Sequence, residues 1–166
     1  MDVRIDDAFG LEVALKSKQL VTGAPGTYVV VLDTGDEVVE QLKRFAERSA
    51  VGTASITAIG GFSTATLAYF DIDSKQYQDI PVDEQVEVLS LSGVVAAGGE
   101  EPQLHMHAVL GRRDGSTRGG HLKAGHVRPT LEVMVTESPP HVVRHHDPAS
   151  GLSLIDLDAW QTGRAS

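Results

Sequence analysis

The clearest structural signal in the chain is the segment Leu104-His105-Met106-His107-Ala108-Val109-Leu110-Gly111. Successive side chains of a β-strand point to opposite faces, so residues two apart share a face. A turn signal follows at Asp114-Gly115, and the chain is expected to return near Arg118. The pattern therefore predicts a β-hairpin with one apolar face, formed by Leu104, Met106, Ala108 and Leu110.

Upstream of this hairpin the sequence predicts one strand followed by one helix. Residues 26–32 are β-branched and aromatic, which is typical of a strand. Thr34-Gly35-Asp36-Glu37 opens the helix, because Thr34 and Glu37 have the spacing of a capping box and acidic residues favour the first turn. Gly52 ends it. Its apolar face is expected to comprise Val38, Leu42, Phe45 and Ala46.

Most of the remaining chain is predicted to form strands. Residues 55–59 and 64–70 flank Gly60-Gly61, which indicates a hairpin, and residues 86–91 and 93–97 form a second strand pair. Residues 98–102 are expected to form a surface loop, and 130–137 form the last clear strand, ended by Pro139-Pro140. One helix among many strands indicates an α+β fold, with a mainly antiparallel β-sheet and one principal α-helix packed on it.

Composition limits the classes of protein. The chain has 166 residues and no cysteine, which excludes disulfides, thiolate zinc sites and a cysteine nucleophile. The apolar runs are too short to span a membrane, and the acidic N-terminus lacks an apolar signal core, so we expect a cytoplasmic protein. The net charge of −9 would repel DNA at long range, although residues 112–144 carry +3. Solvated turns explain that basic stretch better than a nucleic-acid patch does.

Three of the seven histidines have a spacing that favours a metal site. His105 and His107 share one strand face, with Cβ atoms roughly 7 Å apart. The predicted hairpin brings His121, which follows Gly119-Gly120, alongside them, and the glycines allow close backbone approach. Three imidazoles leave an open position suited to zinc, with nickel, copper and iron as alternatives. In the competing interpretation, all three are merely half-exposed strand and turn residues.

Glu132 is the only acidic residue that the sequence singles out. In the strand from Thr130 to Thr136 it shares a face with Thr130 and Met134. It either faces solvent or faces the histidines, where it could hydrogen-bond an imidazole or act as a general base on metal-bound water.

The other histidines are weaker candidates, and His145-His146-Asp147 is interpreted as a solvated loop. These weaker candidates are His126, His141, His145 and His146.

Several segments together resemble the PPC (plant and prokaryote conserved) domain, of the stand-alone prokaryotic type. The resemblance covers roughly residues 27–157, preceded by an N-terminal extension or edge strand (1–26) and followed by a loose tail (158–166). The matching segments are Thr64–Asp71, Val86–Gly93, Leu104–Gly111, Gly119-Gly120-His121-Leu122, Gly125, Pro129–Val133 and Gly151–Ile155.

This resemblance implies a compact homotrimer. It also implies that His105, His107 and His121 form a metal site, since several prokaryotic members carry this pattern. In plants the domain is joined to an AT-hook that contacts DNA, and this sequence has no such hook. Three hypotheses follow. The first is a trimeric metal-binding module with a regulatory role, and the second is a DNA-binding protein without an AT-hook. The third is a metal-dependent hydrolase or lyase of unknown substrate, with Glu132 as the general base.

Overall fold

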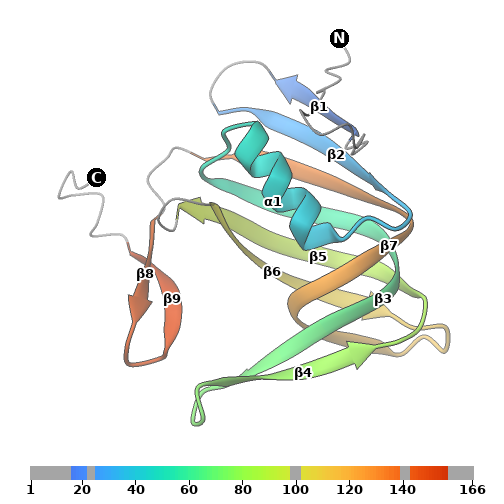
Figure 1. Cartoon of the computed structure of the whole chain (residues 1–166). Helices are drawn as coiled ribbons and strands as arrows, with labels where there is room; N and C mark the ends of the chain where they lie inside the picture. The colour runs from blue at the N-terminus through green and yellow to red at the C-terminus, as the bar shows by residue number, and fades with distance from the viewer. Residues whose placement is uncertain (1–15, 22–24, 98–101, 139–142, 157–166) are drawn as a thin grey trace, which may run out of the picture.

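The computed structural model describes residues 16–21, 25–97, 102–138 and 143–156. Among these residues, no helix has the length and apolar character needed to cross a membrane. Figure 1 shows a single helix lying across a strongly curved sheet. The elements are β1 (Lys16–Val21), β2 (Thr27–Asp33), α1 (Val38–Arg48), β3 (Ala54–Asp71), β4 (Gln76–Val82), β5 (Val86–Ala97), β6 (Pro102–Gly111), β7 (Thr117–Glu137), β8 (Val143–Asp147) and β9 (Leu152–Asp156).

The pairing of the strands brings the sheet back onto itself. Strands β7, β3, β5 and β6 are each paired with the next, and β6 pairs again with the first part of β7. All of these pairs are antiparallel, and among the described strands only β5 and β8 pair in parallel, through Ala97 and Val143. The predicted α+β fold with a mainly antiparallel sheet and one helix is therefore confirmed. The core fills the space between this curved sheet and α1, around Phe62, Leu32, Leu42, Leu67 and Leu131.

Helix α1 begins where the sequence predicts, but its N-cap is a different residue from the predicted one. Its apolar face is buried, as the spacing of Val38, Leu42 and Phe45 predicts. The N-cap is Glu37, whose carboxylate accepts hydrogen bonds from the backbone N–H of Glu40 at 2.8 Å and of Gly125 at 3.0 Å. The predicted capping box is wrong because the Thr34 hydroxyl donates to the carbonyl of Pro129 instead, at 2.8 Å.

The predicted hairpin at Gly60-Gly61 is also wrong, because β3 runs continuously through both glycines. The register of β3 against β5 and β7 shifts here, which marks a bulge. Gly60 has φ of +151°, and a Cβ at this position would lie 2.3 Å from the carbonyl oxygen of Thr130 on β7. Glycine is therefore needed for a bulge and a close strand approach, not for a turn. Strand β5 is likewise a single strand across the two segments predicted to pair with each other.

The chain also forms strands beyond the last one predicted. Residues 130–137 are the end of the 21-residue strand β7, and the hairpin of β8 and β9 follows. Residues 145–147, predicted to form a solvated loop, lie in β8. Pro102, placed in a surface loop by the sequence, is the first residue of β6. The rest of that loop (98–101), Pro139-Pro140, His141 and the predicted tail lie outside the described residues.

Candidate metal centre

The hairpin of β6 and β7 holds the three predicted histidines. The turn is closed by the backbone N–H of Arg112, which donates to Ser116 at 2.8 Å, and the Asp114 carboxylate accepts from the Ser116 N–H at 2.9 Å. With this turn length, His107 pairs directly opposite His121. His105 lies two residues back on the same face of β6, while Met106 and Ala108 are buried on the other face. The predicted alternation and hairpin are therefore confirmed.

The three imidazoles converge on a common point. One ring nitrogen from each of His105, His107 and His121 lies within 4.8 Å of the others, and the ring centroids are 5.1, 5.2 and 5.5 Å apart. The Nε2 atoms of His105 and His107 are 3.2 Å apart. Two nitrogens bound to one tetrahedral zinc ion at 2.0–2.1 Å would lie roughly 3.3 Å apart, so this pair fits such an ion.

Burial also suits a cation at this point. The Nδ1 atom of His121 is buried and has no hydrogen-bond partner among the described residues. A buried polar atom without a partner costs free energy, and a cation is one partner that could satisfy a ring nitrogen. His105 and His121 are half-buried and His107 is exposed, so the cluster lies at the surface, where a further position remains open to solvent or a ligand.

A close approach of β3 places His121. Gly120 lies next to His121, and a Cβ at Gly120 would come within 2.7 Å of the carbonyl oxygen of Ala68. A Cβ at Gly119 would be 3.4 Å from the carbonyl of Ala108, which is ordinary contact. Of the two glycines predicted to permit close approach, Gly120 is therefore the one that the geometry requires.

The surroundings of His105 and His121 favour the neutral form of these two rings. Burial, together with the neighbouring His105, His107 and Lys123, lowers the pKa of His121 to about 4. Burial also lowers the pKa of His105, with Arg144 and His107 acting in the same direction. Neutral imidazoles are the form that ligates metals, so these two rings are ready to bind a cation at neutral pH without losing a proton.

Glu132 does not join the histidines. It lies eleven residues beyond His121 on β7, which is roughly 36 Å of strand at about 3.3 Å per residue, and it pairs with Val31 and Ile59. Its side chain is exposed while Leu131 and Val133 are buried. Of the two readings of Glu132, the structure thus favours the solvent-facing one.

The other three histidines in the described part of the chain lie elsewhere. His126 is exposed on β7, with its Nδ1 3.4 Å from the Thr64 hydroxyl. His145 and His146 are exposed on β8, and His145 Nε2 lies 3.8 Å from the carboxylate of Asp156. His146 pairs with Ser153 on β9. None of these three belongs to the cluster around His121.

Sequence reasoning missed two residues beside the cluster. Arg144 on β8 donates from Nη2 to Nδ1 of His105 at 3.0 Å and from Nη1 to the carbonyl of Ser153 at 2.7 Å. Tyr77 on β4 lies against His121, with ring centroids 5.0 Å apart. The local sign of this hairpin is the short alternation Leu152-Ser153-Leu154. Nothing in the sequence pairs Arg144 with His105, which lies 39 residues away.

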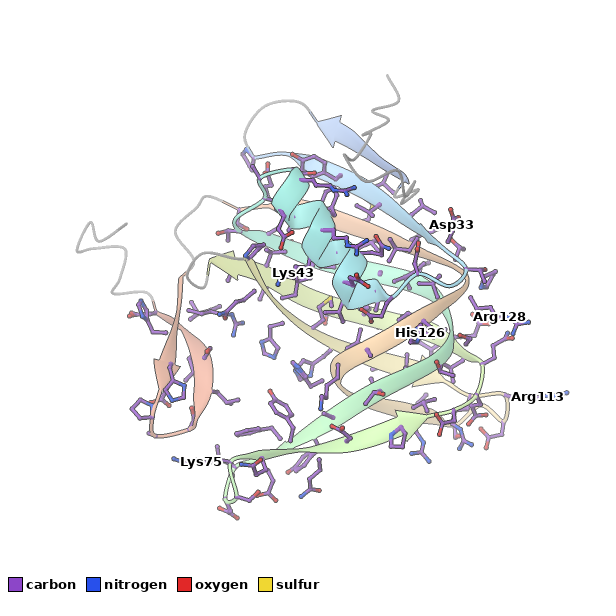
Figure 2. All side chains as sticks on the ribbon, in the orientation of Figure 1. Asp33, Lys43, Lys75, Arg113, His126 and Arg128 are labelled. Carbon is purple, nitrogen blue, oxygen red and sulfur yellow. The ribbon has the colours of Figure 1, made fainter. Side chains whose placement is uncertain are left out.

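Two cations of the basic stretch are paired with carboxylates. Arg112 is paired with Glu84 at 2.5 Å and Lys123 with Asp79 at 2.7 Å, which offsets their charges. Arg144 contacts His105, as described above. Figure 2 shows Arg113 and Arg128 projecting outward from the molecule. The interpretation as solvated turns fits Arg113, whereas Arg128 and Arg144 lie in strands β7 and β8.

Fold and cluster together define a class of protein: a small α+β domain with a curved antiparallel sheet and three histidines on one of its hairpins. The model of the Plants and Prokaryotes Conserved (PCC) domain matches residues 21–139. The chain therefore belongs to this family, which is the PPC family that the sequence resembles. Strands β8 and β9 lie beyond the matched residues.

Solved structures share this fold. A plant- and prokaryote-conserved protein from Pyrococcus horikoshii is 28% identical, with a TM-score of 0.75 over 88% of this chain and 96% of that one. The metal-containing protein AF0104 from Archaeoglobus fulgidus is 35% identical, with a TM-score of 0.73 over 78% and 91%. A "putative DNA binding protein" from Bacteroides thetaiotaomicron is 28% identical, with a TM-score of 0.81 over 87% and 98%.

A curated relative is much longer than this chain. The bifunctional protein GlmU of Synechococcus sp. (strain JA-3-3Ab) is 31% identical over 152 residues, which are 90% of this chain and 23% of that protein. A second Synechococcus GlmU is matched over 20% of its length. The chain thus spans less than a quarter of the curated relatives that it matches.

Proposed function

We propose that this chain is a metal-binding PPC-domain protein that holds one divalent transition-metal ion through His105, His107 and His121. Zinc is the favoured ion, because three imidazole ligands with an open position suit its coordination preferences. The observation that carries the proposal is the convergence of one nitrogen from each ring within 4.8 Å. The metal content of the similar Archaeoglobus fulgidus protein gives independent support.

Metal analysis of the chain purified without a histidine tag tests the proposal. We expect about one zinc per chain after loading and dialysis, and a fall in melting temperature on chelation. Free zinc at 100 times its dissociation constant would stabilise the folded state by about 2.7 kcal/mol. His107→Ala should abolish both effects. His126→Ala, which removes an exposed histidine from β7, the strand that carries His121, should leave both unchanged. Absence of stoichiometric metal, with unchanged melting on chelation, would refute it.

We further propose that the protein is a homotrimer, as the resemblance to the PPC domain implies. The outer face of the sheet carries apolar side chains that association could cover, among them Ile59, which is 60% exposed, and Leu89, which is 54% exposed. Light scattering on the protein eluting from a size-exclusion column should give three times the chain mass of 17.7 kDa. A mass equal to that of one chain would rule the trimer out. The predicted cytoplasmic location stays part of this proposal.

A DNA-associated role is a second candidate. It is favoured by the description of the Bacteroides thetaiotaomicron relative and by the exposed Arg113 and Arg128, and it is opposed by the net charge of −9. Titration against an AT-rich duplex at low salt tests it. Binding weaker than about 0.1 mM would fall below typical nonspecific affinity and exclude this role. If binding occurs, Arg113→Gln with Arg128→Gln should weaken it and reduce its salt dependence.

The hydrolase or lyase alternative lacks the base that the sequence offered for it. Glu132 lies far along β7 from the histidines, so it is in no position to act on a metal-bound water. Among the residues lining the cavity beside His105 and His121, none is acidic. We therefore place metal binding, and not general-base hydrolysis, at the centre of the proposed function.

A further inference from the structure

A small cavity lies beside the histidine cluster, between the β6–β7 hairpin and the β8–β9 hairpin. Its volume is about 180 Å³, which is smaller than the roughly 300 Å³ at the lower end of drug-sized sites. A ligand here would have only a few heavy atoms. The cavity is lined by Tyr77, Gln103, Leu104, His105, His121, Arg144 and Leu152 to Leu154.

The lining is cationic in an otherwise acidic protein. Arg144 is the charged side chain among these residues, and no carboxylate faces it there, although the whole chain carries −9. A bound divalent ion would add two further positive charges next to the cavity. Electrostatic complementarity therefore favours an anion and disfavours a cationic ligand.

The contact between Arg144 and His105 depends on the state of the metal site. A guanidinium group only donates hydrogen bonds, so Nδ1 of His105 must act as the acceptor across the 3.0 Å contact. The other nitrogen of His105, Nε2, lies toward His107. When Nε2 of a neutral imidazole ligates a metal, the ring proton resides on Nδ1. Metal binding therefore turns this contact into two donors facing each other.

Two opposed donors repel each other unless they move apart or an acceptor lies between them. Ligating histidines ordinarily donate their second N–H to a carboxylate, a carbonyl or water, and a guanidinium can take none of these roles. The Nε atom of Arg144 adds to the deficit, because it is buried without a hydrogen-bond partner among the described residues. Nε and Nη2 form one edge of the guanidinium, the edge that pairs with the two oxygens of a carboxylate.

We propose that the cavity binds a short-chain aliphatic carboxylate, whose oxygens accept hydrogen bonds from Arg144 and from Nδ1–H of metal-bound His105. The inference rests on the proposed metal site. Leu104, Leu152 and Leu154 supply an apolar wall for the alkyl part of the ligand, and the volume limits the chain to a few carbons. Arg144 thus acts as the anchor of a ligand site that metal binding opens.

The β8–β9 hairpin positions Arg144 over the cavity. The hairpin turn is stabilised by the Asp147 carboxylate, which accepts from the Ser150 N–H at 2.9 Å, and by Gly151, which has φ of +78°. Lys75, in the turn between β3 and β4, donates to the carbonyl of Pro148 at 2.9 Å. The Lys75 contact ties the hairpin to the turn between β3 and β4, which lies near it in Figure 1.

Calorimetric titration of propionate into the zinc-loaded protein tests the proposal. We expect saturable binding that Arg144→Gln weakens about 10- to 100-fold, the loss typical of a charge-assisted hydrogen bond. Arg144→Lys keeps the charge but not the planar edge, so it should restore only part of the affinity. Arg128→Gln, which removes an exposed arginine from β7, is the matched control and should bind like the unaltered protein. Metal-free protein should bind more weakly, because Arg144 is then engaged by His105.

Zinc content measured on the same samples separates the possible failures. Unaltered zinc content with no propionate binding, or with equal binding by Arg144→Gln, overturns the carboxylate site while leaving the metal site intact. Binding of inorganic phosphate, or of the neutral alcohol n-propanol, with the same affinity as propionate also overturns the carboxylate site. The proposal requires both a carboxylate and an alkyl group. Failure to take up any metal overturns the proposed function and the coupled site together.

Discussion

Acidification should destabilise the metal-free protein through His121. The unfolded chain has the ordinary histidine pKa of 6.5, whereas burial and the neighbouring histidines lower the pKa of folded His121 to about 4. Between these values the unfolded state binds the proton and the folded state does not. The free energy of unfolding is therefore at its full value above pH 6.5 and falls as the pH decreases toward 4.

The expected size of the effect follows from these two pKa values. Without screening, preferential protonation of the unfolded state would lower the free energy of unfolding by about 2 kcal/mol at pH 5 relative to pH 7. The His121 ring is only half-buried, so solvent screening reduces this; we halve it, to about 1 kcal/mol. His105, whose pKa is also lowered, contributes in the same direction.

Urea denaturation at pH 7 and pH 5, with a chelator present and the chain concentration fixed, measures the effect. His121→Asn removes the titrating group, so this variant should lose about 1 kcal/mol less than the unaltered protein over that interval. His126→Asn serves as the control, because it removes an exposed histidine from the same strand and should behave like the unaltered protein. An equal loss of stability in the unaltered protein and in His121→Asn would refute the reasoning.

Further predictions concern the backbone and the helix cap. Gly120→Ala should cost about 1–3 kcal/mol of stability and weaken zinc binding, since its Cβ would meet the Ala68 carbonyl at 2.7 Å, whereas Gly119→Ala should cost far less; similar melting temperatures for the two variants would contradict this. Glu37→Ala should cost about 1–2 kcal/mol in urea denaturation, because it removes the N-cap and leaves the buried Gly125 N–H without its acceptor. Thr34→Ala, which keeps that cap, should cost less, and the reverse order would show that Thr34 caps the helix after all.

Local patterns were sufficient for the hairpin that carries the histidines. The alternation from Leu104 to Leu110 and the turn at Asp114-Gly115 involve residues close in sequence, and a strand pair joined by a short turn has its register set by that turn. His107 opposite His121 follows from this register. The same holds for the apolar face of α1, because its apolar residues recur at helical spacing within three turns.

Local patterns failed where a distant strand decides between two conformations. Gly60-Gly61 is compatible with either a turn or a bulge, and the close approach of Thr130 on β7 selects the bulge. Thr34 is a good helix cap by its residue type, but the Pro129 carbonyl takes its hydroxyl and leaves the cap to Glu37. In both cases the deciding atom belongs to a residue about 70 to 95 positions later in the chain.

The amino-acid order determined that two imidazoles share a strand face and that a third lies across a short turn, because strand periodicity and turn chemistry act over a few residues. The tertiary structure decided that Arg144, from a hairpin near the other end of the described chain, lies 3.0 Å from His105, and that Glu132 does not reach the cluster. Contacts between separate elements depend on how the sheet curves and closes, and no local pattern encodes that curvature.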